Sequence, residues 1–519
     1  MNHRLILFFI CVISAAVGFM ETVSGIVGFC CNDTPDDVRA LMACAAATII
    51  AGTAGYIFFR PRTEQHRKAG LREGYAVAAF GWLAASVLGA LPFFFVVGMP
   101  WYDALFESVS GFTTTGAALL HPGYRLMNGT ELPLGVESLP RGVVFWRALE
   151  SWLGGMGIVV LALAVLPMFN RGGQMLYNAE TPGLKSSDTQ IAPRITSSAK
   201  ILWMIYVGIT VCEVLMLRFA GMDIFEAVCN SFTTVSTGGF CTKQSSITAF
   251  QSQNRLIPLI VMFFMFISGV NFLLHLRFLS GKRLSYFKDE EFRVYTSIIA
   301  GVSCIIAVSL LLQGEAYHVD PDQGFSASMA VVGTAFRDAA FQVVSFMTST
   351  GFTNVEDFCS WPPVALALLV GISVIGGCGG STAGGLKCVR ALLVWRQSLT
   401  EVKHNIFPQL VTGVYLNNIR VKAPAIQKTV AFFTAYIGVI ILFALLIPLF
   451  CPKCTWETGL SASITCLSNV GPGVGQIGSS LGFDSLNAGA KLLSAFEMII
   501  GRLELFTILV LFLPSFWRK

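Results

Sequence analysis

The sequence predicts an all-α polytopic membrane protein, in which two N-terminal helices precede four pseudo-symmetric repeats of helix, re-entrant pore loop and helix. Apolar residues make up 54% of the 519 residues and charged residues only 13%, against about 25% charged residues in soluble domains. Several apolar runs reach the roughly 18 residues that a membrane-spanning helix needs. A motif rich in Ser, Thr and Gly also occurs four times, roughly 113 to 122 residues apart, as GFTTTGA, TTVSTGGF, MTSTGF and LSNVGPG. Such a period is typical of an internal structural repeat.

Ten apolar segments are long enough to cross a bilayer. Their predicted limits are 5–29, 39–59, 74–98, 143–168, 199–219, 256–279, 294–313, 363–395, 427–450 and 489–515. The first two stand apart, and the other eight flank the four motifs in pairs. The sequence therefore divides into two leading helices and four repeats, at 1–70, 71–170, 171–285, 286–422 and 423–519.

The distribution of basic residues predicts the orientation of the chain in the membrane. Basic residues gather after the second, fourth, sixth and eighth spans and at the C-terminus, among them Arg60, Arg67, Arg171, Lys200, Arg277, Lys288, Arg390, Lys422 and Lys519. If ten spans alternate, these segments all lie on one side, which the positive-inside rule assigns to the cytoplasm. Both termini are then cytoplasmic, and all four motifs open to the opposite side.

A short amphipathic segment precedes each motif. The four segments are 101–111, 222–231, 336–346 and 456–466, and their acidic residues Asp103, Asp223, Asp338 and Glu457 lie near their starts. About ten residues are too few to span the membrane, and acidic side chains favour a helix N-terminus. We therefore expect four re-entrant half-helices whose partly negative C-terminal ends converge and stabilise a cation.

The backbone that follows these half-helices is the candidate cation filter. Glycine adopts φ values that turn successive carbonyl groups toward one axis, and such oxygens replace the hydration shell of a cation. The alternative is that the Gly/Ser/Thr clusters are ordinary helix-packing seams, but four copies after four short amphipathic segments favour the filter. The candidate ligands are Thr114, Thr115, Gly116, Ser236, Thr237, Gly238, Gly239, Ser349, Thr350, Gly351, Asn469, Val470 and Gly471. The sequence leaves open whether Gly238 or Gly239 is the filter glycine, and Val470 and Pro472 make the fourth motif the least regular.

A glycine-rich segment interrupts the eighth span and is the candidate gate. Because each glycine costs about 1 kcal/mol relative to alanine in a helix, the segment predicts a flexible loop below the third motif. The candidate gate residues are Gly376, Gly377, Gly379, Gly380, Ser381, Thr382, Gly384 and Gly385, together with Arg502 in the last span. A nucleotide-binding P-loop is excluded, because Lys387 does not directly follow a glycine.

Ionisable residues within apolar runs are costly and by default functional. Arg502 either lies below the filter, where it contacts the glycine-rich segment and raises the barrier to cations, or forms a structural pair with Glu504 or Glu497. Arg147 and Glu150 are predicted to form a structural pair near the outer side.

Over essentially its whole length the chain resembles the bacterial TrkH/TrkG potassium-uptake subunits of the superfamily of K⁺ transporters. Besides the four motifs, the matching stretches are Ser151–Val160, Glu180–Gly183, Ala192–Ile195, Gly376–Gly385 and Gly501–Glu504. The resemblance implies K⁺ as the transported ion, a bacterial inner membrane location, a homodimer, and gating by a cytosolic nucleotide-binding regulator of the TrkA type. It also implies that the glycine-rich segment and Arg502 form the gate. Compared with the potassium-channel signature TVGYG, each motif keeps one clearly placed glycine, and none keeps the second glycine at the same spacing with an aromatic residue between, which predicts weaker discrimination between K⁺ and Na⁺.

Two other functions remain open from the sequence. A K⁺/H⁺ or K⁺/Na⁺ symporter needs a titratable carboxylate in the membrane, for which Glu213, Glu497 and Glu504 are the candidates. A non-conducting scaffold subunit with the same fold is the second. The sequence contains no group of residues that suggests catalysis. It also has no basic face outside the loops, so a nucleic-acid partner is not expected.

Two groups of loop residues carry weaker expectations. The basic segments 171–200 and 396–422 are expected to lie on the lipid bilayer surface or to dock a regulator. Cys451 and Cys454 lie in a loop without a second cysteine pair or a histidine nearby, so a disulfide is favoured over a metal site if the loop faces an oxidising compartment.

Overall fold

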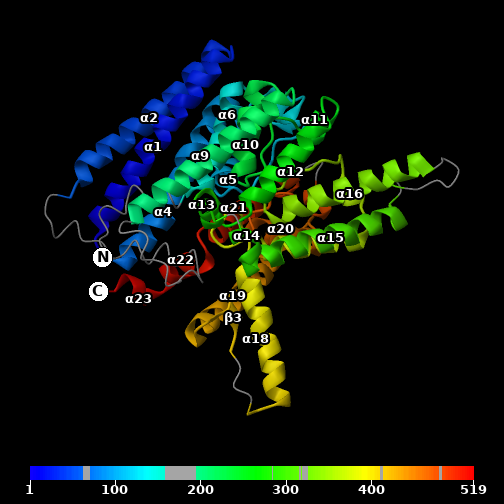
Figure 1. The fold of residues 1–519 in the computed structure, drawn as a ribbon. Coiled ribbons are helices and arrows are strands. Elements are labelled where there is room, and N and C mark those ends of the chain that lie inside the picture. Colours follow the sequence, from blue (N-terminus) through cyan, green and yellow to red (C-terminus); the bar gives the residue numbers. More distant parts are fainter. Residues whose placement is uncertain are drawn as a thin grey trace.

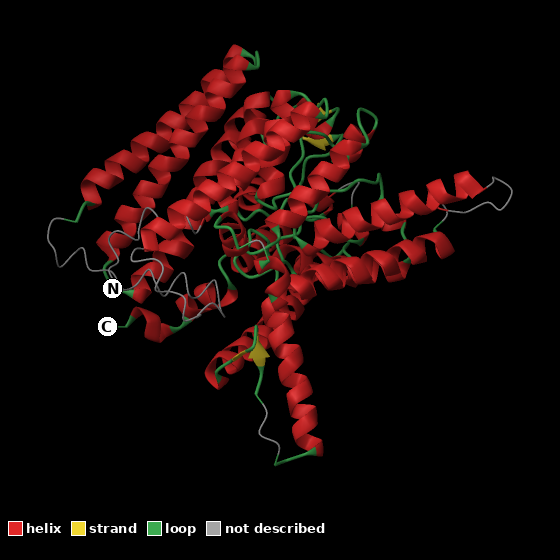
Figure 2. Ribbon diagram, in the orientation of Figure 1, coloured by secondary structure: helices red, strands yellow, loops and turns green. Residues whose placement is uncertain are grey.

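The computed structural model describes residues 1–61, 70–157, 195–282, 284–314, 317, 325–409, 413–478 and 482–518. Within these ranges nearly all regular structure is helical, and the strands are the two antiparallel hairpins β1 (Tyr124–Arg125) with β2 (Glu131–Leu132) and β3 (Tyr415–Leu416) with β4 (Ile419–Arg420) (Figure 2). The fold class predicted from composition and apolar runs is therefore confirmed. The motifs Glu180–Gly183 and Ala192–Ile195 and most of the basic segment 171–200 lie outside the described residues.

The two leading helices form an antiparallel pair at one edge of the molecule (Figure 1). They are α1 (His3–Cys30) and α2 (Pro35–Phe59), the first of which packs on the helices of the first repeat. Thr34 caps α2 by accepting a hydrogen bond from the Asp37 N–H at 3.3 Å, and Pro35 suits the first helical turn. Glycine at position 52 lets the two helices pack closely, since a Cβ atom there would collide with the Ala15 backbone of α1.

The remaining helices follow the order expected for four repeats. The first two repeats contain α4 (Leu71–Pro92), its π-helical continuation η1 (Phe93–Val97), α5 (Trp101–Phe112), η2 (Gly135–Ser138), α6 (Arg141–Gly155), α9 (Ile195–Phe219), α10 (Ile224–Val235), α11 (Thr248–Gln251), α12 (Leu256–Ser268), α13 (Phe272–Leu279) and α14 (Ser285–Lys288). The last two contain α15 (Glu290–Gln313), α16 (Phe325–Met347), η7 (Phe358–Ser360), α17 (Pro363–Ile375), α18 (Cys388–Ile406), α19 (Ala423–Phe450), α20 (Trp456–Leu467), η8 (Gly475–Ile477), η9 (Gly482–Ser485), α21 (Ala488–Arg502), α22 (Leu505–Leu509), η10 (Val510–Phe512) and α23 (Pro514–Trp517).

Three of the four short helices before the motifs match their predicted length, and one does not. The helices α5, α10 and α20 each have 12 residues, with Asp103 and Glu457 in their first turns and Asp223 as an N-cap. The third, α16, has 23 residues, so Asp338 lies inside the helix and not at its N-terminus. The prediction was wrong there because the residues before Phe336 continue the helix, which pairs with α15 and extends away from the centre with it (Figure 1).

Several predicted spans are broken helices. Among the described residues, six helices are long and apolar enough to cross a membrane, or seven if a bent pair counts as one. That pair is α12 and α13, which meet at 96°, so the sixth span is not straight as the apolar run suggested. Asn271 caps α13 by accepting a hydrogen bond from the Leu273 N–H at 2.9 Å. The tenth span also ends early, at Arg502, whereas the break expected in the eighth is present between α17 and α18.

Besides its apolar core, the molecule buries many polar and charged side chains and exposes many large apolar ones. Glu107, Glu150 and Glu213 are fully buried, whereas Phe19, Leu445 and many other large apolar side chains are exposed. Buried ionisable groups together with many exposed large apolar side chains are unusual in soluble proteins and typical of helices that face lipid.

Candidate functional site

Each of the four short helices ends in the same hydrogen-bonded cap. The N–H groups of Thr115, Gly238, Thr350 and Val470 donate to the carbonyl oxygens five residues earlier, Ser110, Thr233, Ser345 and Thr465, at 2.9, 2.7, 2.8 and 2.9 Å. The residue before each donor has a φ of 53° to 57°, namely Thr114, Thr237, Ser349 and Asn469. This combination is the Schellman motif, which satisfies the last carbonyl groups of a helix and turns the chain away from its axis.

The caps fix the register of the four motifs. The glycine that follows each cap by one residue has a φ between 68° and 91°, at Gly116, Gly239, Gly351 and Gly471. Gly239 is therefore the structural equivalent of the other three, Gly238 is the middle residue of its motif, and Ser236 lies one residue too early. Thr, Ser or Asn stands two residues before each of these glycines, but Ser236 also stands two residues before Gly238, so the sequence pattern does not distinguish Gly238 from Gly239.

The four motifs close into one ring. A Cβ atom built on Gly116 would fall on the carbonyl oxygen of Gly238, one on Gly239 on that of Thr350, one on Gly351 on that of Val470, and one on Gly471 on that of Thr115. Each glycine thus touches the middle carbonyl of the next repeat, and the fourth repeat returns to the first. A pseudo-fourfold ring of buried backbone oxygens follows, in which only glycine leaves room for the neighbouring repeat.

Side-chain hydrogen bonds form within the first and third motifs and between the fourth and the first. The hydroxyl groups of Thr113 and Thr115 lie 2.7 Å apart, as do those of Thr348 and Thr350. Val470 has no hydroxyl, but its N–H still makes the cap bond. In this repeat the Asn469 amide donates instead to the Thr115 hydroxyl at 2.9 Å. The irregular fourth motif therefore keeps the backbone geometry of the others.

A cavity of about 120 Å³ opens on one side of the ring and is lined by all four glycines. Arg147 also lines this vestibule, where its guanidinium lies 3.1 Å from Glu107 and stacks on the Phe240 ring. The predicted pair of Arg147 and Glu150 was wrong: Arg147 reaches across to α5, whereas Glu150 accepts a hydrogen bond from Ser108 at 2.8 Å.

A second cation of the vestibule is also neutralised locally. Lys243 lies 3.2 Å from Glu137 and 3.3 Å from Glu226. Burial lowers the pKa of Lys243, but the two carboxylates outweigh that effect and raise its pKa above the usual value. Lys243 therefore stays protonated and paired at the mouth of the ring.

The glycine-rich segment lies on the opposite side of the ring, at a cavity of about 130 Å³. It contacts the second and third repeats: the Gly384 N–H donates to the Ser349 hydroxyl at 2.5 Å, and the Thr382 hydroxyl to Val235 and Ser268 oxygens at 3.1 and 3.2 Å. Gly376, Gly380 and Gly385 have positive φ, so the bend needs glycine there. The predicted loop thus directly touches a candidate filter residue.

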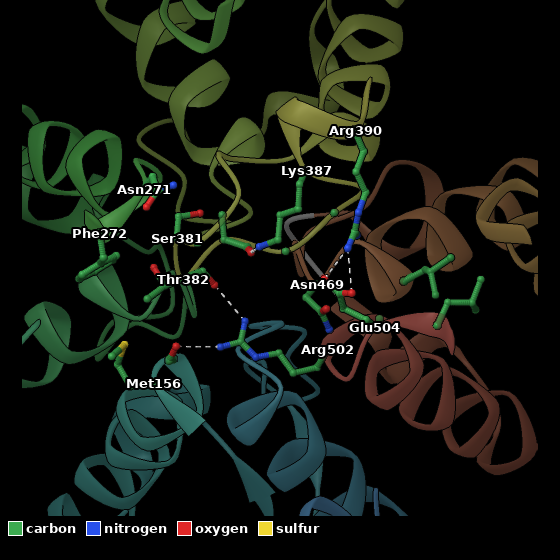
Figure 3. Close-up of a pocket in the computed structure, with 18 of the residues that line it drawn as sticks. Met156, Asn271, Phe272, Ser381, Thr382, Lys387, Arg390, Asn469, Arg502 and Glu504 are labelled. Atoms are coloured by element: carbon green, nitrogen blue, oxygen red, sulfur yellow. Dashed lines mark hydrogen bonds and ion pairs between the residues drawn. The ribbon is translucent and has the colours of Figure 1, made fainter. Parts of the chain in front are cut away.

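Arg502 joins the glycine-rich segment to the end of α6. Its guanidinium donates to the Thr382 oxygen at 2.9 Å (Figure 3). It also donates to the Gly154 and Gly155 oxygens at 2.6 and 3.1 Å. The alternative pairing with Glu504 or Glu497 is wrong, because Glu504 pairs with Arg390 at 2.8 Å (Figure 3) and Glu497 accepts from Ser463. Arg502 therefore lies where the glycine-rich segment meets the cavity.

The remaining candidates lie apart from the ring. The Sγ atoms of Cys451 and Cys454 are 2.7 Å apart, and both cysteines are free thiols. Among the described residues, no three His, Cys, Asp or Glu side chains are grouped as a metal site.

The comparisons with known proteins agree with this architecture. The family TrkH, described as a cation transport protein, matches residues 40–519. Similar relatives include the Trk system potassium uptake protein TrkH of Escherichia coli K12, with 38% identity over 473 residues and 91% of each chain, and TrkG of the same organism, with 32% identity over 86% of each chain. The crystal structure of the potassium transporter TrkH from Vibrio parahaemolyticus matches with a TM-score of 0.83, at 30% identity and 100% coverage of both chains. These relatives are transport proteins and not enzymes, as the sequence indicated. The chain belongs to the TrkH family of cation transport proteins.

Proposed function

We propose that the protein takes up K⁺ through the ring of four motifs, as a passive pathway. The closed ring of four carbonyl oxygens is the observation that carries this proposal. The candidate filter consists of the predicted ligands, aligned by their positions relative to the four helix caps. In this alignment the carbonyl groups of Thr115, Gly238, Thr350 and Val470 are equivalent and form one layer. The printed names of the relatives, which are potassium uptake proteins, support K⁺ as the cargo.

The electrostatics of the ring favour a cation. The C-terminal ends of α5, α10, α16 and α20 point their partly negative carbonyl groups toward the ring. A cation loses water in exchange for these fixed oxygens, which need no reorganisation as it passes. Arg147 and Lys243 in the vestibule repel an entering cation less than unpaired charges would, because each is paired with a carboxylate.

The gate in this proposal is the glycine-rich segment with Arg502. The segment blocks the path below the ring, and the positive charge of Arg502 raises the barrier to cations further. A cytosolic nucleotide-binding regulator of the TrkA type opens the gate, and two copies of the chain form a homodimer. The projecting helix α18 supports such contacts, because Trp395, Leu399, Val402 and Ile406 follow one another at helical spacing and are exposed.

The membrane in this proposal is the bacterial inner membrane, with both termini in the cytoplasm. Symport is the less favoured mechanism because, among the residues that the structure describes, no unpaired carboxylate lines either cavity. Glu213 and Glu497 line neither cavity, and Glu504 lines the inner cavity but is paired with Arg390.

Uptake of Rb⁺ into proteoliposomes under an imposed K⁺ gradient, at symmetric pH and without Na⁺, tests the proposal. Gly351→Ser is expected to abolish uptake, because the added Cβ would collide with the Val470 oxygen of the ring. Gly371→Ser is the matched control, since a Cβ on that membrane glycine meets no atom within 4 Å. Uptake by wild type only with Na⁺ or a proton gradient would favour a coupled carrier, and undiminished uptake by Gly351→Ser would refute the ring.

A further inference from the structure

A buried carboxylate outside the ring holds the glycine-rich segment. Glu291 lies in the first turn of α15 and is 8% exposed. Its Oε1 atom accepts hydrogen bonds from the Gly379 N–H at 2.6 Å and from the Val389 N–H at 3.1 Å. One oxygen atom thus joins the middle of the segment to the first turn of α18.

The carboxylate sits on a well-anchored helix end. Asp289 caps α15 by accepting a hydrogen bond from the Phe292 N–H at 3.0 Å. Asn417, in the turn of the β3–β4 hairpin, donates to Asp289 at 3.1 Å and accepts from the Glu290 N–H at 2.8 Å. Glu290 itself pairs with Arg396 of α18 at 2.8 Å. The position of Glu291 is therefore fixed by contacts that do not involve the glycine-rich segment.

The segment needs such a hold because its own sequence does not specify one conformation. Six of its ten residues, Gly376 to Gly385, are glycine, and glycine loses more conformational freedom on ordering than any other residue. Its other polar contacts include Ser349 and Arg502 on the pathway side, and two backbone bonds to the bend between α12 and α13, where the Cys378 N–H donates to the Gly269 oxygen at 2.9 Å and the Phe272 N–H to the Gly380 oxygen at 3.0 Å. Glu291 adds a side-chain acceptor from α15, which is not part of the ring.

We propose that Glu291 is a positioning residue that keeps the glycine-rich segment in its closed conformation, by accepting two backbone hydrogen bonds. The consequence for ion flow rests on the proposed function, whereas the hold on the segment does not. A charged acceptor is needed less than a fixed one, because both donors are neutral N–H groups. Glutamine retains the Oε1 acceptor, and alanine removes it.

The thiol of Cys378 reports on this hold directly, because it lies within the segment and is 1% exposed. Modification by a maleimide, followed by mass spectrometry of the peptide that carries Cys378, measures how often the segment opens. In purified full-length protein, Glu291→Ala is expected to react about tenfold faster or more, since the two lost hydrogen bonds together contribute at least that factor. Glu291→Gln is expected to stay within about threefold of wild type.

Glu290→Ala is the matched control, because it neighbours Glu291 and its carboxylate contacts Arg396 and neither segment N–H. Exposed Cys30, at the end of α1, serves as the internal reference in every variant. Unchanged Cys378 reactivity in Glu291→Ala would overturn the proposal, as would equal acceleration in Glu290→Ala. If Glu291→Ala does not fold, hydrogen exchange of the wild type decides: peptides covering Gly379 and Val389 must exchange slowly, and fast exchange overturns the proposal.

Rb⁺ uptake separates this proposal from the function on which it rests. Faster uptake by Glu291→Ala than by wild type, without a regulator, supports both. Faster Cys378 modification in Glu291→Ala, with uptake by both proteins only when Na⁺ or a proton gradient is supplied, leaves the hold on the segment intact and refutes the passive pathway.

Discussion

At the residue scale, the ring depends on backbone conformations that its own side chains disfavour. Thr114 and Thr237 have φ of 54° and 57°, which is rare for a β-branched residue. Such a conformation costs on the order of 1–3 kcal/mol and persists only where the surroundings impose it. Here the two cap hydrogen bonds of each motif and the contact with the next repeat do so. Strain repeated at equivalent positions around one ring is what a preorganised binding site requires.

The buried pair of Arg147 and Glu107 is predicted to stabilise the vestibule strongly. Arg147→Met leaves the Glu107 carboxylate, which has no exposed surface, without its counter-charge. Removal of one partner of a buried pair costs about 3–5 kcal/mol. We therefore expect a clear loss of thermal stability in detergent, measured by scanning fluorimetry.

Arg125→Met is the control for that loss, because the Arg125–Glu131 pair is exposed on both sides. Exposed pairs contribute about 0–1 kcal/mol, so this variant is expected to melt close to wild type. Equal melting temperatures for Arg147→Met and wild type would contradict the assigned role of the buried pair.

At the scale of elements, apolar runs predicted which segments are helical but not where the helices break. The bend between α12 and α13 falls at Gly269 and Asn271, in a run that remains apolar on both sides. The N-terminal half of α16 was missed for a related reason, because it pairs with α15 in three dimensions and the segment was judged on its last ten residues alone. Hydrophobic patterning reports burial in an apolar phase and not direction.

The candidate site was predicted in outline, and its register was not. The four motifs follow from composition and period, and the glycine-rich segment from its departure from helix propensity. The choice of Gly239 over Gly238 needs the positive φ of Thr237, which no local preference of threonine indicates. Glu291 was missed because its partners are backbone N–H groups about ninety positions away in the sequence.

Substitution of Arg502 tests whether the glycine-rich segment obstructs the pathway. Arg502→Ala removes the three hydrogen bonds to Thr382, Gly154 and Gly155 and a positive charge from the cavity. We expect Rb⁺ uptake without a regulator to rise by about tenfold or more, since each such bond to a charged donor contributes at least 1.4 kcal/mol or so. Arg218→Ala, at the far end of α9, removes a similar charge away from the segment and is expected to leave uptake unchanged. Lower uptake by Arg502→Ala than by wild type would show that Arg502 supports the pathway and does not obstruct it.

At the scale of the whole molecule, the two ends of the chain lie on one side. The backbone N–H of Asn2 donates to Glu73 at 3.0 Å, and Arg72 donates to the Arg518 oxygen at 2.6 Å. Both termini thus meet the start of α4 and lie near each other (Figure 1). On the opposite side of the molecule, the loop after α1 is joined to the first repeat. Asp33 in this loop accepts hydrogen bonds from the backbone N–H groups of Arg141 and Gly142, at the start of α6.

The orientation of these two sides in the membrane follows from charge and is directly testable. The basic segments predict that the side with the termini and α18 is cytoplasmic, and Cys30 is then exposed to the outside. In intact cells, a membrane-impermeant maleimide is expected to modify Cys30, whereas a cysteine introduced by Ser398→Cys, on exposed α18 surface, reacts only after permeabilisation. Peptide mass spectrometry reads both sites in one sample, so that reagent access and expression are matched. The reverse pattern would invert the molecule and make the vestibule cytoplasmic, and uptake would then have to begin at the glycine-rich segment instead of at the ring.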